Sequence, residues 1–396
     1  MIGSPFEGLR VALVHDWLTG MRGGERVLEA LVRMFPRAEI FTLLHVPGSV
    51  SAELERRTAH RSVVQRLPAA ARLYRHYLPM FPFAIEQFDL DRFDLIVSSS
   101  HCAAKAVVPA GRAVHVCYCH SPMRYAWDQF DAYFGEERVG RVAARLLRRY
   151  MGRLARWDAD TASRVHRFVA NSRHVAARIA RYYGRAARVV HPPVDTEFFT
   201  PEGRLADNYL LIVSALVPYK RLDLAIAAAE AAELPLKIVG RGPELSRLSR
   251  MAPPQVEFLG SRSNEEIRAL YRGAAALVMP GEEDFGMVPV EAQACGCPVV
   301  ALARGGALES VVDGVTGVLV RDASVSAFAD GLRRVRRMPI DVATMRAHVE
   351  KFSTEVFIER MTGAINDALC TRSQSSGARN LNSGLNPKPE QQNPEP

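Results

Sequence analysis

Long apolar runs are missing from this sequence. Hydrophobic residues make up 48% of its 396 residues, yet no run approaches the roughly 20 consecutive apolar residues that a membrane-spanning helix needs. The N-terminal residues 1–8 also contain no basic segment followed by an apolar stretch, so no signal peptide is predicted. These two absences predict that the body of the chain is cytoplasmic.

Cysteine is scarce, and its spacing disfavours the common zinc sites. The six cysteines are Cys102, Cys117, Cys119, Cys295, Cys297 and Cys370. The two Cys-x-Cys pairs stand in strand-like or helix-edge contexts and have no partner pair at the spacing of a zinc site. We therefore expect reduced, mostly buried thiols, as in a cytosolic protein.

The pattern that remains is that of an α/β protein. The chain is long enough for two or three domains. Apolar runs alternate with segments of helical periodicity, which predicts parallel sheets covered by helices. The main predicted strands are 9–15, 94–99, 114–119, 167–170, 209–214, 236–239, 256–259, 274–279, 299–301 and 318–320.

These strands fall into two groups, and the polar stretch 200–208 between them predicts an interdomain linker. We expect two Rossmann-like domains that face a central cleft, residues 1–199 and residues 208–352. An amphipathic helix is predicted for 353–370. From residue 371 onward few large apolar residues remain, so 371–396 is predicted to be a disordered tail.

The segment GEEDFGMVPVEA, residues 281–292, carries two carboxylates eight positions apart. The apolar run 274–279 predicts a buried strand before it, and the periodicity from Val290 onward predicts a helix. Glu283 then lies in a loop and Glu291 in the first turns of the helix, at the sheet edge where α/β folds bind ligands. An ionised Glu291 there is suited to accept hydrogen bonds from sugar hydroxyls. The alternative for either acid is a simple partner of the helix dipole.

The first strand-to-helix turn is HDWLTGMRGGE, residues 15–25, and it lacks the Gly-x-Gly-x-x-Gly fingerprint of dinucleotide binding. NAD binding is therefore disfavoured. Gly23 and Gly24 still permit a close backbone approach at a helix N-terminus, which suits a phosphate group. A plain tight turn is the alternative.

Other candidate residues follow predicted strands. Lys220 can point into the crevice, and phosphate groups need such fixed cations. His120 ends the strand 114–119, and Gly240 and Arg262 follow two strands of the second group. The alternatives are a solvated lysine, a structural histidine and ordinary turn residues.

Asp89-Leu90-Asp91 matches the Asp-x-Asp pair that can hold Mg²⁺ or Mn²⁺ on a diphosphate. It stands at the amino end of the predicted strand 94–99, away from the ligand crevice. We attribute the match to chance and predict no metal site.

The net charge is +8, and many of the basic residues cluster in one segment. Seven arginines stand at helical spacing with apolar residues between them and no acid: Arg138, Arg141, Arg145, Arg148, Arg149, Arg153 and Arg156. A basic amphipathic helix is a candidate for peripheral attachment to the anionic inner leaflet of the cell membrane. A solvated helix face is the alternative. No aromatic and basic stacking platform is found, which disfavours nucleic acid as a partner.

The pair Glu283-x7-Glu291, followed by ACGCPVV at 294–300 and GGALESVVDGVTG at 305–317, resembles the signature of retaining nucleotide-sugar glycosyltransferases of family GT4. The resemblance covers about residues 9–370 and implies the GT-B fold, in which the last helix packs back on the first domain. The HDWLTGMRGGE opening is similar to bacterial polysaccharide or O-antigen mannosyltransferases. The implied reaction needs no metal or other cofactor. It moves a hexose, first of all mannose from GDP-mannose, to a lipid-linked or polysaccharide acceptor.

The resemblance also implies roles for single residues. Glu283 and His120 would face the donor sugar, Lys220 would bind the diphosphate and Glu291 would bind the ribose. The other donor-binding positions are Gly23, Gly24, Gly240, Arg262, Gly286, Met287 and Val288. Further candidates to line the cleft are Asp16, Trp17, Asn171 and Ser172.

One position departs from the family pattern: Ala215 stands where an arginine is usual. The loss of that charge would reduce transition-state stabilisation by roughly a few kcal/mol, unless Arg221 or Arg241 compensates. Two other classes therefore stay open. One is a catalytically weakened, sugar-nucleotide-binding partner subunit; the other is a sugar-phosphorylase-like or NAD-type Rossmann enzyme.

Overall fold

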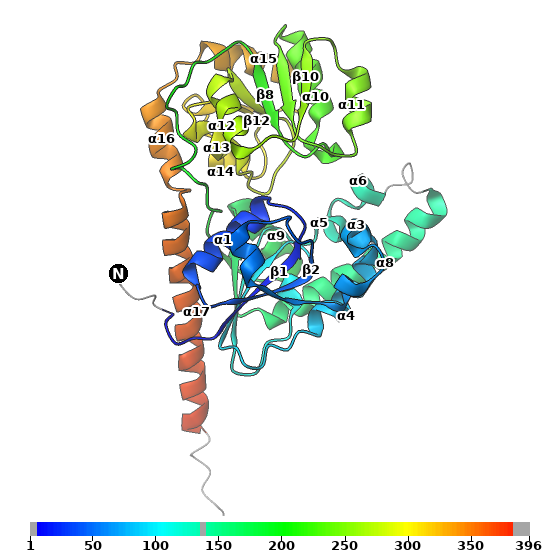
Figure 1. Cartoon of the computed structure of the whole chain (residues 1–396), viewed down its shortest axis with the longest axis vertical. Coiled ribbons are helices and arrows are strands. Elements are labelled where there is room, and N and C mark those ends of the chain that lie inside the picture. Colours follow the sequence, from blue (N-terminus) through cyan, green and yellow to red (C-terminus); the bar gives the residue numbers. More distant parts are fainter. Residues whose placement is uncertain (1–5, 135–139, 383–396) are drawn as a thin grey trace, which may run out of the picture.

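The computed structural model describes residues 6–134 and 140–382. Two parallel sheets form two lobes, one above the other in Figure 1. The N-terminal sheet has the order β3-β2-β1-β4-β5-β6-β7 and the C-terminal sheet the order β10-β9-β8-β11-β12-β13. The architecture is therefore α/β with two Rossmann-like domains, as predicted.

The inner strands are almost wholly buried, as parallel strands covered on both faces should be, whereas the edge strands β3, β7 and β10 are partly exposed. In the N-terminal sheet they are β1 Val11–Leu18, β2 Glu39–His45, β3 Thr58–Arg61, β4 Leu95–Ser100, β5 Val114–Cys119, β6 Arg167–Ala170 and β7 Ala187–Val189. In the C-terminal sheet they are β8 Leu210–Val213, β9 Leu236–Val239, β10 Val256–Gly260, β11 Ala276–Met279, β12 Val299–Leu302 and β13 Gly317–Val320. The strand order reverses next to β1 and next to β8, and such switch points open a crevice at the carboxyl ends of the strands.

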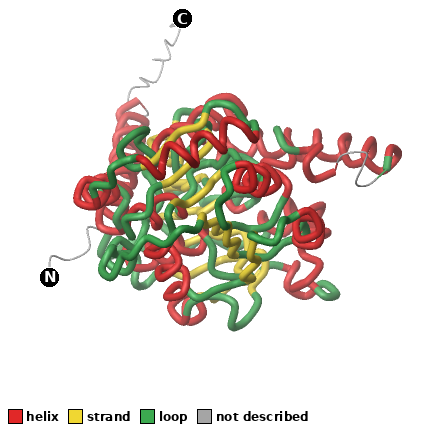
Figure 2. Tube along the Cα trace, turned by 90° about the horizontal axis from the view of Figure 1, so that it is seen from above, coloured by secondary structure: helices red, strands yellow, loops and turns green. Residues whose placement is uncertain are grey.

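Helices cover both sheets, and Figure 2 shows the strands enclosed by them. In the N-terminal lobe they are α1 Gly23–Met34, α2 Ala52–Arg57, α3 Ala70–Leu73, α4 Phe81–Glu86, α5 Arg124–Trp127, α6 Phe130–Phe134, α8 Arg141–Asp160 and α9 Arg173–Tyr183. In the C-terminal lobe they are α10 Leu222–Ala231, α11 Leu245–Met251, α12 Asn264–Gly273, α13 Val288–Ala294, α14 Ala307–Ser310, α15 Val325–Arg337 and α16 Val342–Glu350. Short 3₁₀ turns are η1 Val63–Arg66, η2 Tyr74–Met80, η3 Ala104–Ala106, η4 Thr161–Arg164 and η5 Pro218–Lys220.

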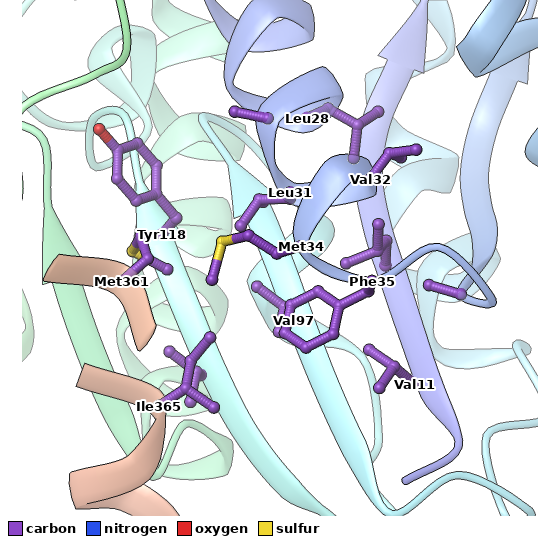
Figure 3. Packing of buried hydrophobic residues seen from close by; sticks show 14 of the residues in the cluster. Val11, Leu28, Leu31, Val32, Met34, Phe35, Val97, Tyr118, Met361 and Ile365 are labelled. Carbon is purple, nitrogen blue, oxygen red and sulfur yellow. The ribbon is translucent and has the colours of Figure 1, made fainter. Parts of the chain in front are cut away.

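The last helix, α17 Thr354–Asn382, returns from the second lobe to the first (Figure 1). Its Met361 and Ile365 are fully buried with Leu31 of α1, Val97 of β4 and Tyr118 of β5 (Figure 3). Each such side chain stabilises the packing by about 1.5–3 kcal/mol. The helix therefore fastens the two ends of the chain to one core.

The prediction of disorder from residue 371 is wrong for 371–382, because these residues continue α17. The segment has one glycine and no proline, so nothing stops a helix that is already nucleated. Arg372 also anchors it by donating to the backbone carbonyls of Ala113 (2.7 Å) and Gly111. Residues 383–396 lie outside the described residues.

Helix α8 projects away from the body of the N-terminal lobe in both views (Figures 1 and 2). Apart from Ala144, its buried residues lie in its second half and include Met151, Leu154 and Asp158. Arg138 of the predicted basic helix lies outside the described residues. Among the described helices, none combines the length and apolar character needed to cross a membrane.

All six cysteines are free thiols, and only Cys370 is exposed. This confirms the expectation of reduced, mostly buried cysteines.

Candidate active site

A cavity of about 290 Å³ lies where the two lobes meet, at the carboxyl ends of β8 and β11. Its C-terminal wall includes Ser214, Ala215, Lys220, Gly281, Glu283, Gly286 and Val288. Arg22 and Gly23, at the start of α1, line it from the N-terminal lobe. The crevice predicted from the sequence is thus an interdomain cavity.

Lys220 and Glu283 form an ion pair in the wall of this cavity. Both side chains are largely buried, with 18% and 13% exposed. Burial and the nearby Arg124 guanidinium lower the pKa of Lys220 to about 7, while its contact with Glu283 favours the charged form. The pair brings together an acid and a cation that the sequence separates by more than sixty positions.

The Gly23–Gly24 pair faces this wall from the other lobe. A side chain at Gly23 would meet the sulfur of Met287 at 3.3 Å, and one at Gly24 would meet the rings of His15 (3.3 Å) and His120 (3.7 Å). The absence of side chains at these positions leaves the first turn of α1 close to the cavity without crowding these neighbours. Its free backbone N–H groups suit an anion.

His120 lies at the end of β5 in a relay of polar side chains. Its Nε2 is 2.8 Å from Ser99 Oγ, and the same oxygen is 3.0 Å from His15 Nδ1. Burial, with the neighbouring His101 and His15, lowers the pKa of His120 well below its ordinary value. His120 is therefore neutral near pH 7 and can donate or accept a hydrogen bond.

Glu25 closes this relay at its far end. Its carboxylate lies 3.9 Å from His15 Nε2, and it also caps α1 by accepting from the Arg22 amide at 3.1 Å. Burial alone would raise the pKa of Glu25, but its interaction with the His15 ring, 3.9 Å away, holds the pKa below the ordinary value.

Asp16 does not line the cleft, contrary to our expectation, because it is fully buried. Its two oxygens accept four backbone hydrogen bonds of 2.6–3.0 Å from residues 101–104, which follow β4. A carboxylate with this many donors stabilises a loop. Asp16 therefore positions the end of β4, including the His101 ring, beside the site.

Glu291, expected to bind ribose, makes two contacts in this structure. It accepts a hydrogen bond from Tyr271 (3.0 Å) and pairs with Arg26 of α1 (3.0 Å). Burial raises the pKa of Glu291, and Arg26 and Tyr271 oppose that shift. Its buried carboxylate thus joins the lobes.

A second interdomain contact centres on Asp284, next to Glu283. Arg124 donates to it through Nε at 2.8 Å, and Arg178 donates through Nη1 at 2.9 Å. Burial would raise the pKa of Asp284, but the two guanidinium groups lower it overall. The sequence pattern did not point to these three residues, although an acid inside the glycine-containing loop was a signal that was available.

Other predicted positions lie elsewhere. Gly240 and Arg262 do not line this cavity. A side chain at Gly240 (φ +137°) would collide with the Ser214 carbonyl. This glycine therefore allows the end of β9 to approach the end of β8. Arg262 is near Glu266 on the surface (3.6 Å). Arg221 pairs with Asp223 (3.2 Å) and does not line the cavity either.

A larger cavity, of about 470 Å³, lies at the opposite edge of the N-terminal sheet. Gly111, Arg164, His166 and Arg372 are among its lining residues. It shares no residue with the interdomain cavity.

Asp89 and Asp91 belong to a turn before β4, in which the Asp91 amide donates a hydrogen bond to the Asp89 carboxylate (3.1 Å). Within the described residues no cluster of three or more His, Cys, Asp or Glu side chains is placed to hold a metal ion.

Solved structures with this architecture are glycosyltransferases of the GT-B class. Anabaena HepE, in complex with UDP-glucose, is 20% identical and has a TM-score of 0.65, over 90% of this chain and 99% of that chain. Sucrose-phosphate synthase from Thermosynechococcus elongatus is 18% identical with a TM-score of 0.67, over 91% and 100% of the two chains. At these identities the likeness shows the fold, which is GT-B.

The two lobes also match two family models. Residues 21–198 match the model described as Glycosyltransferase Family 4, and residues 194–353 match Glycosyl transferases group 1. Together with the fold, these matches support a glycosyltransferase of the GT4 type.

Curated relatives from Mycobacterium tuberculosis and Mycobacterium bovis carry the name D-inositol 3-phosphate glycosyltransferase. They are 35% identical over 199 residues, which is 43% of this chain and 41% of the relative. The aligned part thus spans about two fifths of the length of the curated relatives that the chain matches.

Proposed function

We propose that this chain transfers a hexosyl group from a nucleoside-diphosphate sugar to a glycan or lipid-linked acceptor, with retention of anomeric configuration. The observation that carries the proposal is the Lys220–Glu283 pair opposite the N-terminus of α1 across one cavity. A GT4-type glycosyltransferase would use such an arrangement to bind a donor between its lobes.

The chemistry of the site fits a leaving diphosphate. Negative charge grows on the diphosphate as the glycosidic bond breaks, and fixed cations and backbone N–H groups aimed at it lower the barrier. Lys220 supplies a cation, and the first turn of α1 at Gly23 and Gly24 supplies N–H groups. We infer that no metal ion is needed, because these groups already supply positive charge. The Asp-x-Asp pair Asp89 and Asp91 lies before β4, at the amino end of that strand and away from the interdomain cavity.

The sugar would lie between Glu283 and His120. Glu283 is suited to accept hydrogen bonds from sugar hydroxyls, and neutral His120 is suited to position the ring. Retention without a protein nucleophile then follows if the departing phosphate takes the proton of the acceptor hydroxyl as the acceptor attacks from the same face. His120 is a positioning group in this scheme, because its low pKa makes it a weak base.

For the donor we propose GDP-mannose first, because the residue 15–25 segment is similar to bacterial mannosyltransferases. UDP-glucose is the main rival, since Anabaena HepE is seen in complex with it. The nucleotide base would contact backbone groups, so the two donors need direct comparison.

For the acceptor we propose a lipid-linked saccharide at an anionic membrane. The exposed half of α8 carries Val142 (75% exposed) and Leu146 (66% exposed) beside Arg145 and Arg149. Apolar and basic side chains on one helix face are the combination that binds to a lipid headgroup layer.

The proposal is tested by turnover of a donor panel with membrane extract as acceptor source, with and without EDTA. We expect release of GDP or UDP that EDTA leaves unchanged. Glu283→Gln should reduce kcat by about 10²–10³-fold, the range for loss of one transition-state contact. Glu282→Gln is the matched control, because this neighbouring acid is 46% exposed and makes only a long contact with His174 (3.6 Å).

Three results would contradict parts of this assignment. A Glu283→Gln protein as active as wild type would contradict the assignment of the active site. A product of inverted anomeric configuration would contradict the retaining mechanism. Tight nucleotide-sugar binding without turnover on any donor would favour the catalytically weakened partner subunit.

A further inference from the structure

The cavity between the lobes has only one cation on its C-terminal wall. Lys220 is there, but position 215 carries an alanine methyl group, and both residues line the cavity. A diphosphate carries more charge than one ammonium group can balance, so its binding calls for another positive group.

The arginines close to Ala215 in sequence or space are directed elsewhere. Arg221 is bound to Asp223 and faces solvent, and Arg241 is exposed and does not line the cavity. Arg124 is nearer to Lys220, but it donates to the buried Asp284 at the lobe contact. None of the three faces the empty space above Ala215.

Arg22 lines the same cavity as Ala215. It is the one basic residue besides Lys220 among those that line the cavity, and it comes from the opposite lobe. It is the N-cap of α1, with an extended backbone (φ −134°, ψ −171°), and its amide is bound to Glu25 (3.1 Å). Across the part of the chain that the structure describes, no carboxylate lies within ion-pair distance of its guanidinium, and its side chain is exposed toward the cleft.

We propose that Arg22 supplies the second cation for the donor diphosphate, in place of the one that Ala215 lacks. The inference rests on the proposed function and names a further binding residue of the same site. Lys220 would hold the diphosphate from one lobe and Arg22 from the other, next to the N–H groups of Gly23 and Gly24. The small side chain at position 215 leaves room for the Arg22 guanidinium to reach the phosphates.

This arrangement has a consequence for specificity. Because the two cations sit on different lobes, both can contact the phosphates only when the lobes are closed. A nucleoside diphosphate would then favour closure more than a nucleoside monophosphate with the same base.

The test uses the full chain and calorimetric titration with UDP, GDP, UMP and GMP, without acceptor. Arg22→Gln should weaken nucleoside-diphosphate binding by about 10–100-fold, the range for a hydrogen bond between charged groups. Its effect on the monophosphates should be several-fold smaller. Arg221→Gln removes the same charge from an exposed, paired arginine and should bind like wild type. Ala215→Arg in the Arg22→Gln background should restore most of the lost affinity.

The outcomes separate the inference from the function on which it rests. Binding by Arg22→Gln that equals that of Arg221→Gln overturns the role of Arg22 and leaves the glycosyltransferase proposal standing. Equal weakening for mono- and diphosphates, with no rescue by Ala215→Arg, also overturns it, because that pattern indicates a disturbed α1. A wild-type chain that binds neither UDP nor GDP overturns both.

Discussion

The protonation state of Lys220 changes near neutral pH. Its pKa is lowered to about 7 by burial and by Arg124, whereas a diphosphate beside it would favour the ammonium form and raise that pKa. The bound state then holds more protons than the free state above pH 7. By linkage, affinity must fall as pH rises through 7 and be nearly constant below it.

We therefore predict that nucleoside-diphosphate affinity weakens by up to about tenfold per pH unit above pH 7, with uptake of up to one proton per nucleotide. Calorimetry in buffers of different ionisation enthalpy measures this uptake directly. Lys220→Arg is the control, because arginine stays charged throughout and should abolish the uptake. Proton uptake that persists in Lys220→Arg would assign it to another group.

At the residue scale the sequence pointed to single candidates and not to the contacts between them. Glu283 and Lys220 were candidates because each follows a strand, and strand ends gather at one sheet edge. Their ion pair, and the Arg26 and Tyr271 contacts of Glu291, join residues from distant segments. No local spacing contains that information. Asp16 was misassigned for the same reason, since four backbone donors from residues 101–104 bury it.

Helix α8 divides into an anchored half and an exposed half. Asp158 in the anchored half is fully buried and binds Lys105 (3.0 Å), Trp127 (2.7 Å) and Tyr183 (2.8 Å). The exposed half presents Val142 and Leu146. An anchored half with a projecting apolar and basic end would suit the peripheral membrane contact that we propose.

We predict that the chain binds vesicles with anionic lipid and that Leu146→Glu weakens this binding about tenfold. The change removes the insertion of one leucine, which stabilises binding by about 1.5–3 kcal/mol, and adds a like charge to the lipid surface. Co-sedimentation with phosphatidylglycerol–phosphatidylcholine vesicles measures it. Leu205→Glu is the matched control, because Leu205 is 83% exposed in the linker, away from α8.

Binding should also fall steeply as salt is raised, because the arginines contribute through screened charges. If Leu146→Glu and Leu205→Glu sediment equally, α8 is a solvated helix and the membrane proposal fails.

Element boundaries followed from the sequence for several of the continuous, apolar strands. β5, β6 and β9 begin and end at the predicted residues, and β10, β12 and β13 agree within one residue. β2 (EIFTLLH) was missed, although it is largely apolar. β3 (TAHR) and β7 (ARV) were not predicted either, because each is a short edge strand with little apolar content. They are strands only because the sheet beside them offers hydrogen-bond partners.

The whole molecule is held closed by ion pairs across the lobes. Asp284 binds Arg124 and Arg178, and Glu291 binds Arg26. Glu309 of α14 adds a third contact by accepting from the Arg173 amide (2.8 Å) and pairing with His191 (3.0 Å). These contacts join the lobes that form the interdomain cavity, so we expect their loss to favour an open arrangement.

We predict that Asp284→Ala shifts the ligand-free chain to an open form with a larger radius of gyration. Loss of one partner of a buried, hydrogen-bonded charge pair costs about 2–5 kcal/mol, mainly because the other charges are left unpaired. Small-angle X-ray scattering measures the change, and saturating nucleotide should reverse part of it. Glu282→Ala, next to it but 46% exposed, should keep the wild-type value. An unchanged radius in Asp284→Ala would show that closure depends on other contacts.

The sequence by itself determined the α/β class, the two-domain division and the acids, glycines and lysine at the strand ends, because periodicity and strand-end position are local properties. It did not show that α17 continues beyond residue 370, where Arg372 contacts the backbone of the N-terminal lobe. The tertiary structure alone decided which candidates meet. It placed Arg22 of one lobe over Ala215 and Lys220 of the other and paired Asp284 with two arginines. Contacts between lobes depend on the packing of whole domains, and that packing leaves no periodic signal in either segment.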